Sequence, residues 1–168
     1  RPRVAQYTGG ARGYRPFVRL AHRVGWPSAF SNGRGVVLAG ERMIGMEVPA
    51  RAVWLRTLLA EINRVVASLM FLGTFPLEIG TSAPPVSALH QREALQVVME
   101  EATDARVRYM LNRVGALLAA APGGWPGRAR RLLAQRGATH GDTVARLHPS
   151  GPSSADRSAA RGGPPPRR

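Results

Sequence analysis

The sequence contains no cysteine and no lysine. The lack of cysteine excludes disulfides, thiolate metal sites and iron–sulfur ligation within this chain. All 24 basic residues are therefore arginines, and with 10 acidic residues they give a formal net charge of +14. An arginine-only complement with abundant Ala, Gly and Pro is typical of a GC-rich genome, so nucleotide bias accounts for part of this charge. The remainder is compatible with RNA, DNA, acidic proteins or anionic lipid headgroups as partners.

The common catalytic and ligand-binding motifs are also missing. We find no GxGxxG, GxxxxGK[ST], HExxH or GxSxG pattern. The four histidines do not pair at metal-ligand spacing; they are His22, His90, His140 and His148. The N-terminus lacks the apolar core of a signal peptide. The residues alone therefore predict no catalytic residue and no metal site.

The most informative stretch runs from residue 49 to residue 80 and predicts a long amphipathic helix. On a helical projection its large apolar residues fall within one arc; they are Leu55, Leu58, Leu59, Ile62, Val65, Val66, Leu69, Met70 and Leu72. Pro49 suits a helix start, Gly73 a helix end, and Pro76 opposes any continuation. Arg56, Glu61, Asn63 and Arg64 interrupt the apolar residues, so we do not predict a membrane span.

Further helices are predicted on both sides of this stretch. Residues 28–45 and 84–103 have helical apolar patterns, a turn is expected at Gly115, and a short arginine-rich helix follows Pro126. The glycines within 28–45 weaken that helix but allow another backbone to approach it closely. Glu41 lies among apolar neighbours, which favours a structural ion pair with an arginine over a catalytic role. Glu78 follows the central helix in an apolar loop and is the carboxylate most worth noting.

The two ends of the chain differ from this helical centre. Residues 1–27 form a basic arm without acidic residues, and its glycines predict irregular or extended backbone with a short helical turn near Phe17. Its arginines and aromatic rings could grip a polyanion, but solvated arginines with packed rings are the favoured interpretation. Residues 137–168, rich in Gly, Pro and Arg, are predicted to be a disordered tail.

Three blocks in the middle of the chain carry a resemblance to a known family. They are AGERMIGMEVPARA, LRTLLAEINRVVASLMFLGTFPLEIG and ALHQREALQVVMEEATDAR, all within residues 39–106. These blocks resemble the D subunit of respiratory NADH:quinone oxidoreductase, the hydrogenase-like large subunit of that enzyme, and the similarity extends over about residues 4–133. The chain is identified as a truncated or divergent member of this family.

The resemblance implies a mainly α fold, in which residues 28–136 are the helical core of the nickel–iron hydrogenase-like large subunit. It also implies a subunit of a proton-translocating enzyme that contributes to quinone reduction, with NADH as the electron donor and quinone as the substrate of the complex. No metal or iron–sulfur cluster is expected on this chain. The expected partners are the cluster-bearing subunit and other peripheral-arm subunits, with peripheral contact to membrane subunits. The expected location is the cytoplasmic face of a bacterial plasma membrane.

The chain departs from the family pattern at positions near the quinone. The family's quinone-ligating tyrosine aligns with Trp26, which keeps a ring but loses the hydroxyl, and a family histidine near the terminal cluster aligns with Arg108. The histidine after the family's alanine-serine pair aligns with Ser68, and of the HRG motif only Arg3 remains. The family's aspartate near the chamber aligns with Glu78, our candidate residue for the quinone chamber. The resemblance therefore implies a catalytically impaired subunit.

The alternative is an arginine-rich helical binding or assembly module for anionic partners without catalytic activity, with nucleic acid the less favoured partner.

Overall fold

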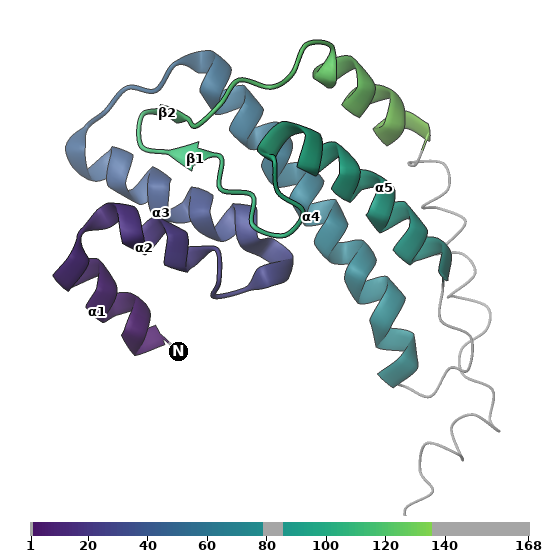
Figure 1. Ribbon diagram of the computed structural model, residues 1–168, viewed down its shortest axis with the longest axis horizontal. Coiled ribbons are helices and arrows are strands. Elements are labelled where there is room, and N and C mark those ends of the chain that lie inside the picture. The colour runs from purple at the N-terminus through teal and green to yellow at the C-terminus, as the bar shows by residue number, and fades with distance from the viewer. Residues whose placement is uncertain (1, 79–85, 136–168) are drawn as a thin grey trace, which may run out of the picture.

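The structure, a computed structural model, is mainly helical, as predicted (Figure 1). It describes residues 2–78 and 86–135. The helices are α1 (Pro2–Arg12), α2 (Tyr14–Ala21), the 3₁₀ turn η1 (Trp26–Ser28), α3 (Ala29–Ile44), α4 (Ala50–Glu78) and α5 (Val86–Thr103). A short antiparallel hairpin follows, with β1 (Asn112–Arg113) paired to β2 (Ala116–Leu117), and a further helix covers residues 125–135. The predicted disordered tail, residues 137–168, lies outside the described residues.

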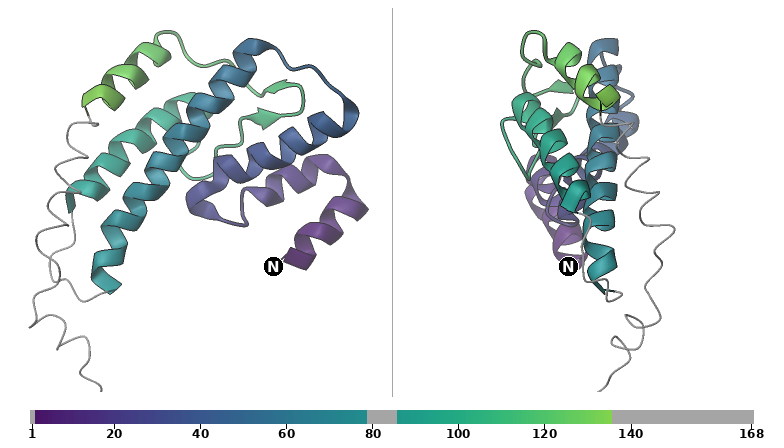
Figure 2. Two further views of the ribbon diagram at one scale, coloured as in Figure 1. Left: turned by 180° about the vertical axis from the view of Figure 1, so that it is seen from behind. Right: turned by 90° about the vertical axis from the view of Figure 1, so that its right-hand side faces the viewer.

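Helix α4 is the centre of the molecule. Helix α5 runs beside it, and α3 and η1 pack on its other side, while α2 covers α3 and α1 covers α2 (Figure 2). The apolar face predicted for α4 is the one that builds the core, because Leu59, Ile62, Val66 and Leu69 are all buried. The partner residues come from α3, α5 and the segment after α5; among the largest are Phe30, Leu95, Met99, Leu111 and Trp125.

Helix α4 continues past the two residues at which the sequence predicts its end. An ideal Cβ at Gly73 would lie 2.5 Å from Cδ2 of Leu89, so this glycine lets α5 pack closely rather than stopping the helix. Pro76 is buried inside α4. Proline removes one backbone hydrogen bond, and here the loss is small because only two helical residues follow. The prediction of a helix end near Gly73 was therefore wrong.

By length and hydropathy, Ala50–Pro76 of α4 is comparable to a helix that crosses a membrane. In the structure this segment instead forms the centre of the helical core. It also carries a buried arginine, Arg56, whose partners come from two other parts of the chain, α3 and the hairpin. A core helix can be as long and as apolar as a helix that crosses a membrane. Length and hydropathy therefore do not assign α4 a membrane role.

The N-terminal residues are helical, which corrects the expectation of irregular backbone. Helix α1 contains Gly9 and Gly10, and α2 begins directly after Gly13, whose φ of 78° makes the bend between them. Gly9 allows the Phe17 ring to approach, since an added Cβ would lie 3.2 Å from that ring. Packing between α1 and α2 therefore outweighs the low helix propensity of glycine.

Glu41 and Arg56 form the buried ion pair that the sequence predicts for Glu41, although the helical projection places Arg56 on the polar side of its helix. Both terminal guanidinium nitrogens donate to the Glu41 carboxylate at 2.9 Å. Nη2 of Arg56 also donates to the carbonyls of Arg113 (2.6 Å) and Ala116 (2.8 Å). The Gly115 N–H donates to Glu41 Oε1 at 2.8 Å. This arrangement, which we call the Glu41–Arg56 clamp, joins α3, α4 and the hairpin.

The turn predicted at Gly115 is confirmed, and it lies inside the hairpin, whose two short strands were not predicted. Gly115 has φ 76°, a conformation that other residues adopt only with strain. The helix at 125–135 is fixed by Trp125, which is fully buried and donates from Nε1 to the Val98 carbonyl at 2.8 Å. The sequence predicts this helix but not the role of Trp125 in attaching it to α5.

Candidate functional site

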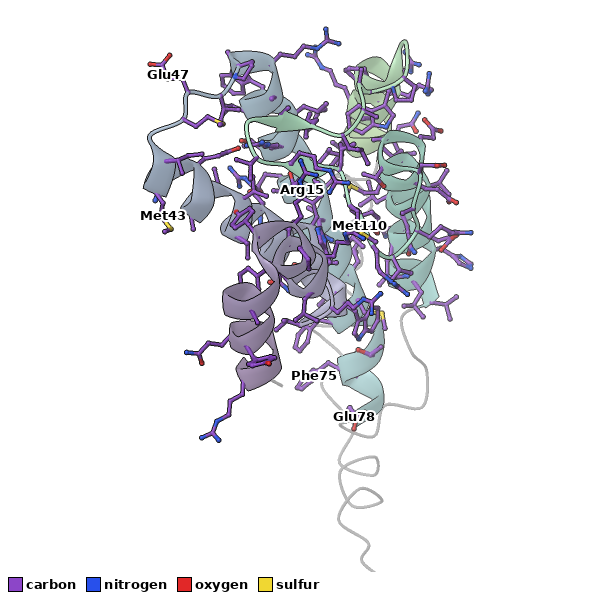
Figure 3. All side chains as sticks on the ribbon, turned by 60° about the vertical axis from the view of Figure 1, so that its left-hand side comes forward. Arg15, Met43, Glu47, Phe75, Glu78 and Met110 are labelled. Carbon is purple, nitrogen blue, oxygen red and sulfur yellow. The ribbon has the colours of Figure 1, made fainter. Side chains whose placement is uncertain are left out.

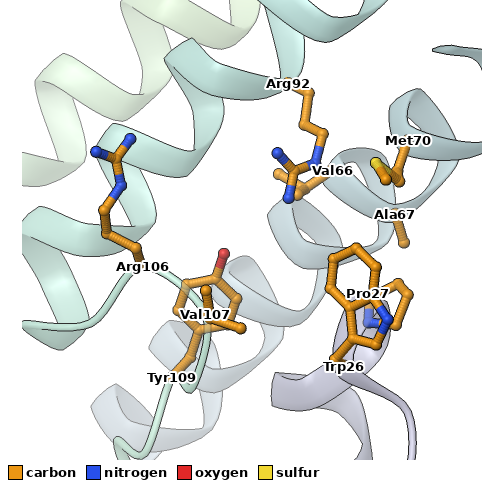
Figure 4. A pocket seen from close by; sticks show the side chains of 9 residues that line it. All are labelled: Trp26, Pro27, Val66, Ala67, Met70, Arg92, Arg106, Val107 and Tyr109. Atoms are coloured by element: carbon orange, nitrogen blue, oxygen red, sulfur yellow. The ribbon is translucent and has the colours of Figure 1, made fainter.

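The candidate site is a small hollow between η1, α4, α5 and the segment before the hairpin (Figure 4). It is lined by Trp26, Pro27, Val66, Ala67, Met70, Arg92, Arg106, Val107 and Tyr109. Gly25 and Pro27 flank Trp26 and hold it in the 3₁₀ turn, so the indole projects over α4 rather than into the core. Trp26 keeps 52% of its surface exposed, so its ring forms one edge of the hollow.

Tyr109 and two arginines supply the polar groups of the hollow. The Tyr109 ring is buried, and Figure 4 shows its hydroxyl directed toward the space between Arg92 and Arg106. Burial raises the pKa of Tyr109 above its ordinary value of 10.0, and the positive charges of Arg92 and Arg106 partly oppose that rise. Tyr109 therefore stays a neutral hydrogen-bonding hydroxyl at physiological pH.

The two arginines differ in their pairing. Arg106 forms ion pairs with Glu93 and, at 3.3 Å, with Glu100, so its charge is balanced at the surface. The Nε of Arg92 is buried and has no hydrogen-bond partner among the described residues. Of the two arginines, Arg92 is therefore the one whose guanidinium can donate a hydrogen bond to a group bound in the hollow.

The hollow is narrow in this structure. Its cavity volume is about 10 Å³, which is close to the minimum that a single water molecule needs. An aromatic or quinone ring requires more room, so Trp26 would have to move before a ring could enter. Among the residues described, no group of three or more His, Asp or Glu side chains is placed to hold a metal ion.

The structure separates the residues that the sequence associates with quinone. Glu78 is exposed at the last residue of α4 (Figure 3), eleven residues beyond Ala67 of the hollow, which is about 16 Å along the helix. Arg3 and Arg108 are exposed on α1 and on the segment before the hairpin. Ser68 faces away from the core, and its hydroxyl donates to the Arg64 carbonyl at 3.0 Å. Of this set, Trp26 alone lies at the hollow.

Tyr109 is the residue that sequence reasoning missed. It lies in a segment without a helical or strand pattern, so periodicity did not indicate its burial. The available signal was a single aromatic residue between arginines, in the run Arg106, Arg108 and Arg113. Such a ring needs a packing partner, and the structure provides one beside α5.

Comparisons with known proteins give the chain its relatives. The second of two D subunits of NADH-quinone oxidoreductase from Streptomyces griseus is 58% identical over 124 residues, which is 74% of this chain and 32% of that protein. The first D subunit of the same enzyme from Streptomyces coelicolor is 59% identical over the same length and coverage. The D subunit from Campylobacter hominis is 34% identical over 112 residues, which is 67% of this chain and 28% of that protein. No protein-family model matches the chain.

A solved structure agrees with these relatives. A chain of the membrane-bound sulfane sulfur reductase, an archaeal respiratory membrane complex, superimposes with a TM-score of 0.76 and 26% identity, covering 81% of this chain and 37% of that one. The fold is therefore that of a helical subunit found in respiratory membrane complexes. The chain itself is a homologue of the NADH-quinone oxidoreductase D subunit, and it spans about a third of the length of the curated relatives it matches.

Proposed function

We propose that this chain takes part in a membrane-associated NADH-quinone oxidoreductase as a homologue of the D subunit and contributes to the wall of its quinone-reduction site. The observation that carries this proposal is the 58% identity to the Streptomyces griseus protein across 124 residues. A match of that length in a chain of 168 residues has to include α4 and α5, two of the elements that form the hollow. Electrons from NADH would reach quinone through partner subunits, since this chain contains no cysteine with which to ligate an iron–sulfur cluster.

The partners proposed for the chain are the cluster-bearing subunit and other peripheral-arm subunits, with peripheral contact to membrane subunits. Its place would be the cytoplasmic face of a bacterial plasma membrane. The arrangement is supported by the likeness to a chain of an archaeal respiratory membrane complex. The long apolar helix α4 is consistent with a subunit that packs against others, because several of its large side chains remain exposed; they are Val53, Trp54, Phe71 and Phe75.

We further propose that quinone reduction is impaired in this chain. A quinone carbonyl is best stabilised by a hydroxyl donor positioned beside it, and Trp26 lacks the hydroxyl of the family tyrosine with which it aligns. The hydroxyl residue among those that line the hollow, Tyr109, lies on another wall of it, and the cavity volume of the hollow is about 10 Å³. Glu78, the candidate chamber carboxylate, would act only if other subunits formed a chamber wall at the far end of α4.

The test is complementation in Streptomyces coelicolor. The host's own first D subunit is removed, this chain is supplied, and both its incorporation into the isolated complex and the rate of NADH-dependent quinone reduction are measured. We expect incorporation with slow turnover. Trp26→Tyr should raise turnover about tenfold, the effect of one restored hydrogen bond in the transition state. Trp26→Phe, which introduces a ring of the same size without the hydroxyl, is the matched control and should leave turnover unchanged.

Two results would contradict the proposal separately. Absence of the chain from the isolated complex would reject the role as a subunit. Turnover equal to that of the native protein would reject impairment and leave the role as a subunit intact. If Trp26→Tyr and Trp26→Phe behave alike, a hydroxyl at this position has no part in quinone reduction.

A further inference from the structure

A second concave surface, separate from the Trp26 hollow, lies between α2 and the hairpin. It is lined by Tyr14, Arg15, Val18, Arg19, Arg113 and Val114, and its cavity volume is about 400 Å³. We call it the α2–hairpin groove. Its volume is within the usual range for sites that bind small molecules, roughly 300–1,000 Å³. The groove therefore has room for a ligand in the structure as it stands.

Three arginines meet at this groove, and no acidic residue lines it among those described. Arg15 and Arg19 are one helical turn apart on α2, so their side chains lie on the same face of that helix. Arg113 comes from β1, on the opposite side of the groove. Figure 3 shows Arg15 on the side of α2 that faces the hairpin. Two distant parts of the sequence thus supply the positive charge.

These three side chains differ from the described arginines that form ion pairs. Arg56, Arg64, Arg106 and Arg128 are each paired with a glutamate. The guanidinium groups of Arg15, Arg19 and Arg113 form no ion pair and no hydrogen bond with a described residue. Like charges one helical turn apart destabilise a helix. Three unbalanced guanidinium groups around one concavity therefore favour a bound anion.

The groove also has a fixed apolar floor. Val18 is buried, and the Tyr14 hydroxyl donates to the Val36 carbonyl of α3, which holds that ring against the neighbouring helix. The hairpin that carries Arg113 is held in turn by the Glu41–Arg56 clamp, through the Arg113 and Ala116 carbonyls. Both walls of the groove are thus attached to the core, and the arginines project from rigid elements.

We propose that the α2–hairpin groove binds a ligand bearing two or more negative charges on phosphate groups. Arginine forks match phosphate oxygens in geometry and charge, and three of them balance the charge of a diphosphate. The phosphate could belong to a soluble diphosphate ester or to the headgroup of an anionic lipid, and the experiment separates these sources.

Binding is measured by isothermal titration calorimetry on the full chain, with inorganic pyrophosphate as the probe. Sedimentation with phosphatidylcholine vesicles that contain cardiolipin, whose headgroup carries two phosphates, tests the lipid source, with pure phosphatidylcholine vesicles for comparison. We expect pyrophosphate to bind, and the affinity to fall as ionic strength rises. Arg19→Gln should weaken binding about tenfold, which is the loss of one charge-assisted hydrogen bond. Arg128→Gln, which removes an exposed arginine outside the groove, is the matched control.

The outcomes decide both the site and the source. Pyrophosphate binding that depends on Arg19 supports the proposal with a soluble diphosphate. Binding to the cardiolipin vesicles alone, lost in Arg19→Gln and not in Arg128→Gln, supports it with a lipid headgroup. Equal loss in the two variants, or no binding to either probe, overturns it. Because Arg15 and Arg19 are exposed, Arg15→Gln and Arg19→Gln should keep the melting temperature of the parent chain, which shows that lost binding is not unfolding.

Discussion

At the residue scale, the Glu41–Arg56 clamp joins α3, α4 and the hairpin through buried polar groups. The two side chains are almost fully buried, and the arginine has four acceptor atoms and the carboxylate three donor atoms within 2.9 Å. Burying two charges is costly, and it is tolerated only when nearly every polar atom has a partner. Removing one member therefore leaves the other as an uncompensated charge inside the protein.

We expect Glu41→Gln to lower the free energy of unfolding by about 3 kcal/mol, the usual cost of breaking a buried ion pair. Urea denaturation followed by circular dichroism measures this change. Glu61→Gln is the matched control, since the Glu61–Arg64 pair is exposed and such pairs contribute about 1 kcal/mol or less. Equal losses in the two variants would show that the buried pair contributes no more to stability than the exposed pair does.

His22 links stability to pH at the same scale. Its side chain is buried, both ring nitrogens lack a partner among the described residues, and the ring lies against Gly33, where an added Cβ would come within 2.4 Å. Burial lowers the pKa of His22 below its ordinary value of 6.5, and the nearby charge of Arg113 adds to that effect. The folded protein thus holds the neutral ring, while the unfolded chain takes up a proton below pH 6.5.

The contribution of His22 to stability is therefore complete above pH 6.5 and is lost as the pH falls below that value. We expect the free energy of unfolding to decrease from about pH 7 to about pH 5, and His22→Gln to remove part of that slope. Denaturant titrations across this pH range give the free energy of unfolding at each pH. The slope of that free energy against pH, and not its absolute value, is then compared between the parent and the variant. A slope identical in parent and variant would mean that other groups cause the acid sensitivity.

At the scale of elements, the contact between α4 and α5 depends on the absence of a side chain at Gly73. A Cβ there would lie 2.5 Å from Cδ2 and 2.9 Å from Cγ of Leu89. We expect Gly73→Ala to destabilise the protein by about 1–3 kcal/mol, the cost of overpacking, although alanine is the better helix former. Thermal unfolding of the parent and the variant measures this loss of stability.

The control for this prediction is another helical glycine. Gly35 lies within α3 and has nothing within 4 Å of an added Cβ, so Gly35→Ala should stabilise by up to about 1 kcal/mol. Gly73→Ala combined with Leu89→Ala should lose less than the sum of the two single changes, because the smaller side chain removes the clash. If Gly73→Ala also stabilises, the helices are not packed through this glycine.

The elements that the sequence predicts correctly are those with regular apolar spacing. Helix α3 (Ala29–Ile44) falls within the predicted 28–45, and α5 (Val86–Thr103) within 84–103. The errors come from tertiary packing that overrides local preference. Gly9 in α1 and Gly73 in α4 predict breaks, yet they are points of close contact, and the strands of the hairpin are attached through the clamp, which no local pattern indicates. The hollow depends on Tyr109, a long-range neighbour of Trp26 that no local pattern indicates.

At the scale of the whole molecule, exposed apolar side chains gather at the corner where α3 leads into α4. We call Met43, Ile44, Val53 and Trp54 the corner patch; their exposed fractions are 86%, 63%, 44% and 75%. Figure 3 shows Met43 projecting from the end of α3. Exposed apolar side chains on two helix ends joined by one short loop favour an interaction site, and in a separately produced chain they promote association.

We expect the double substitution Met43→Gln and Trp54→Gln to raise the monomer fraction of the isolated chain at micromolar concentration. Sedimentation velocity measures that fraction. Val24→Gln is the matched control, because Val24 is also exposed (71%) but lies outside the corner patch. Similar behaviour of the two proteins would show that association, if present, uses another surface.

The clamp also imposes an order on synthesis. Arg56 reaches carbonyl groups 57 and 60 residues later in the chain, so a ribosome that has delivered α3 and α4 has not yet supplied the carbonyls and the Gly115 N–H that complete the hydrogen bonds of the buried pair. Until residues 113–116 emerge, Glu41 and Arg56 remain only partly satisfied, and the apolar face of α4 also waits for α5. The nascent chain is therefore most exposed to misassembly, and to binding by chaperones, while α5 and the hairpin are being made.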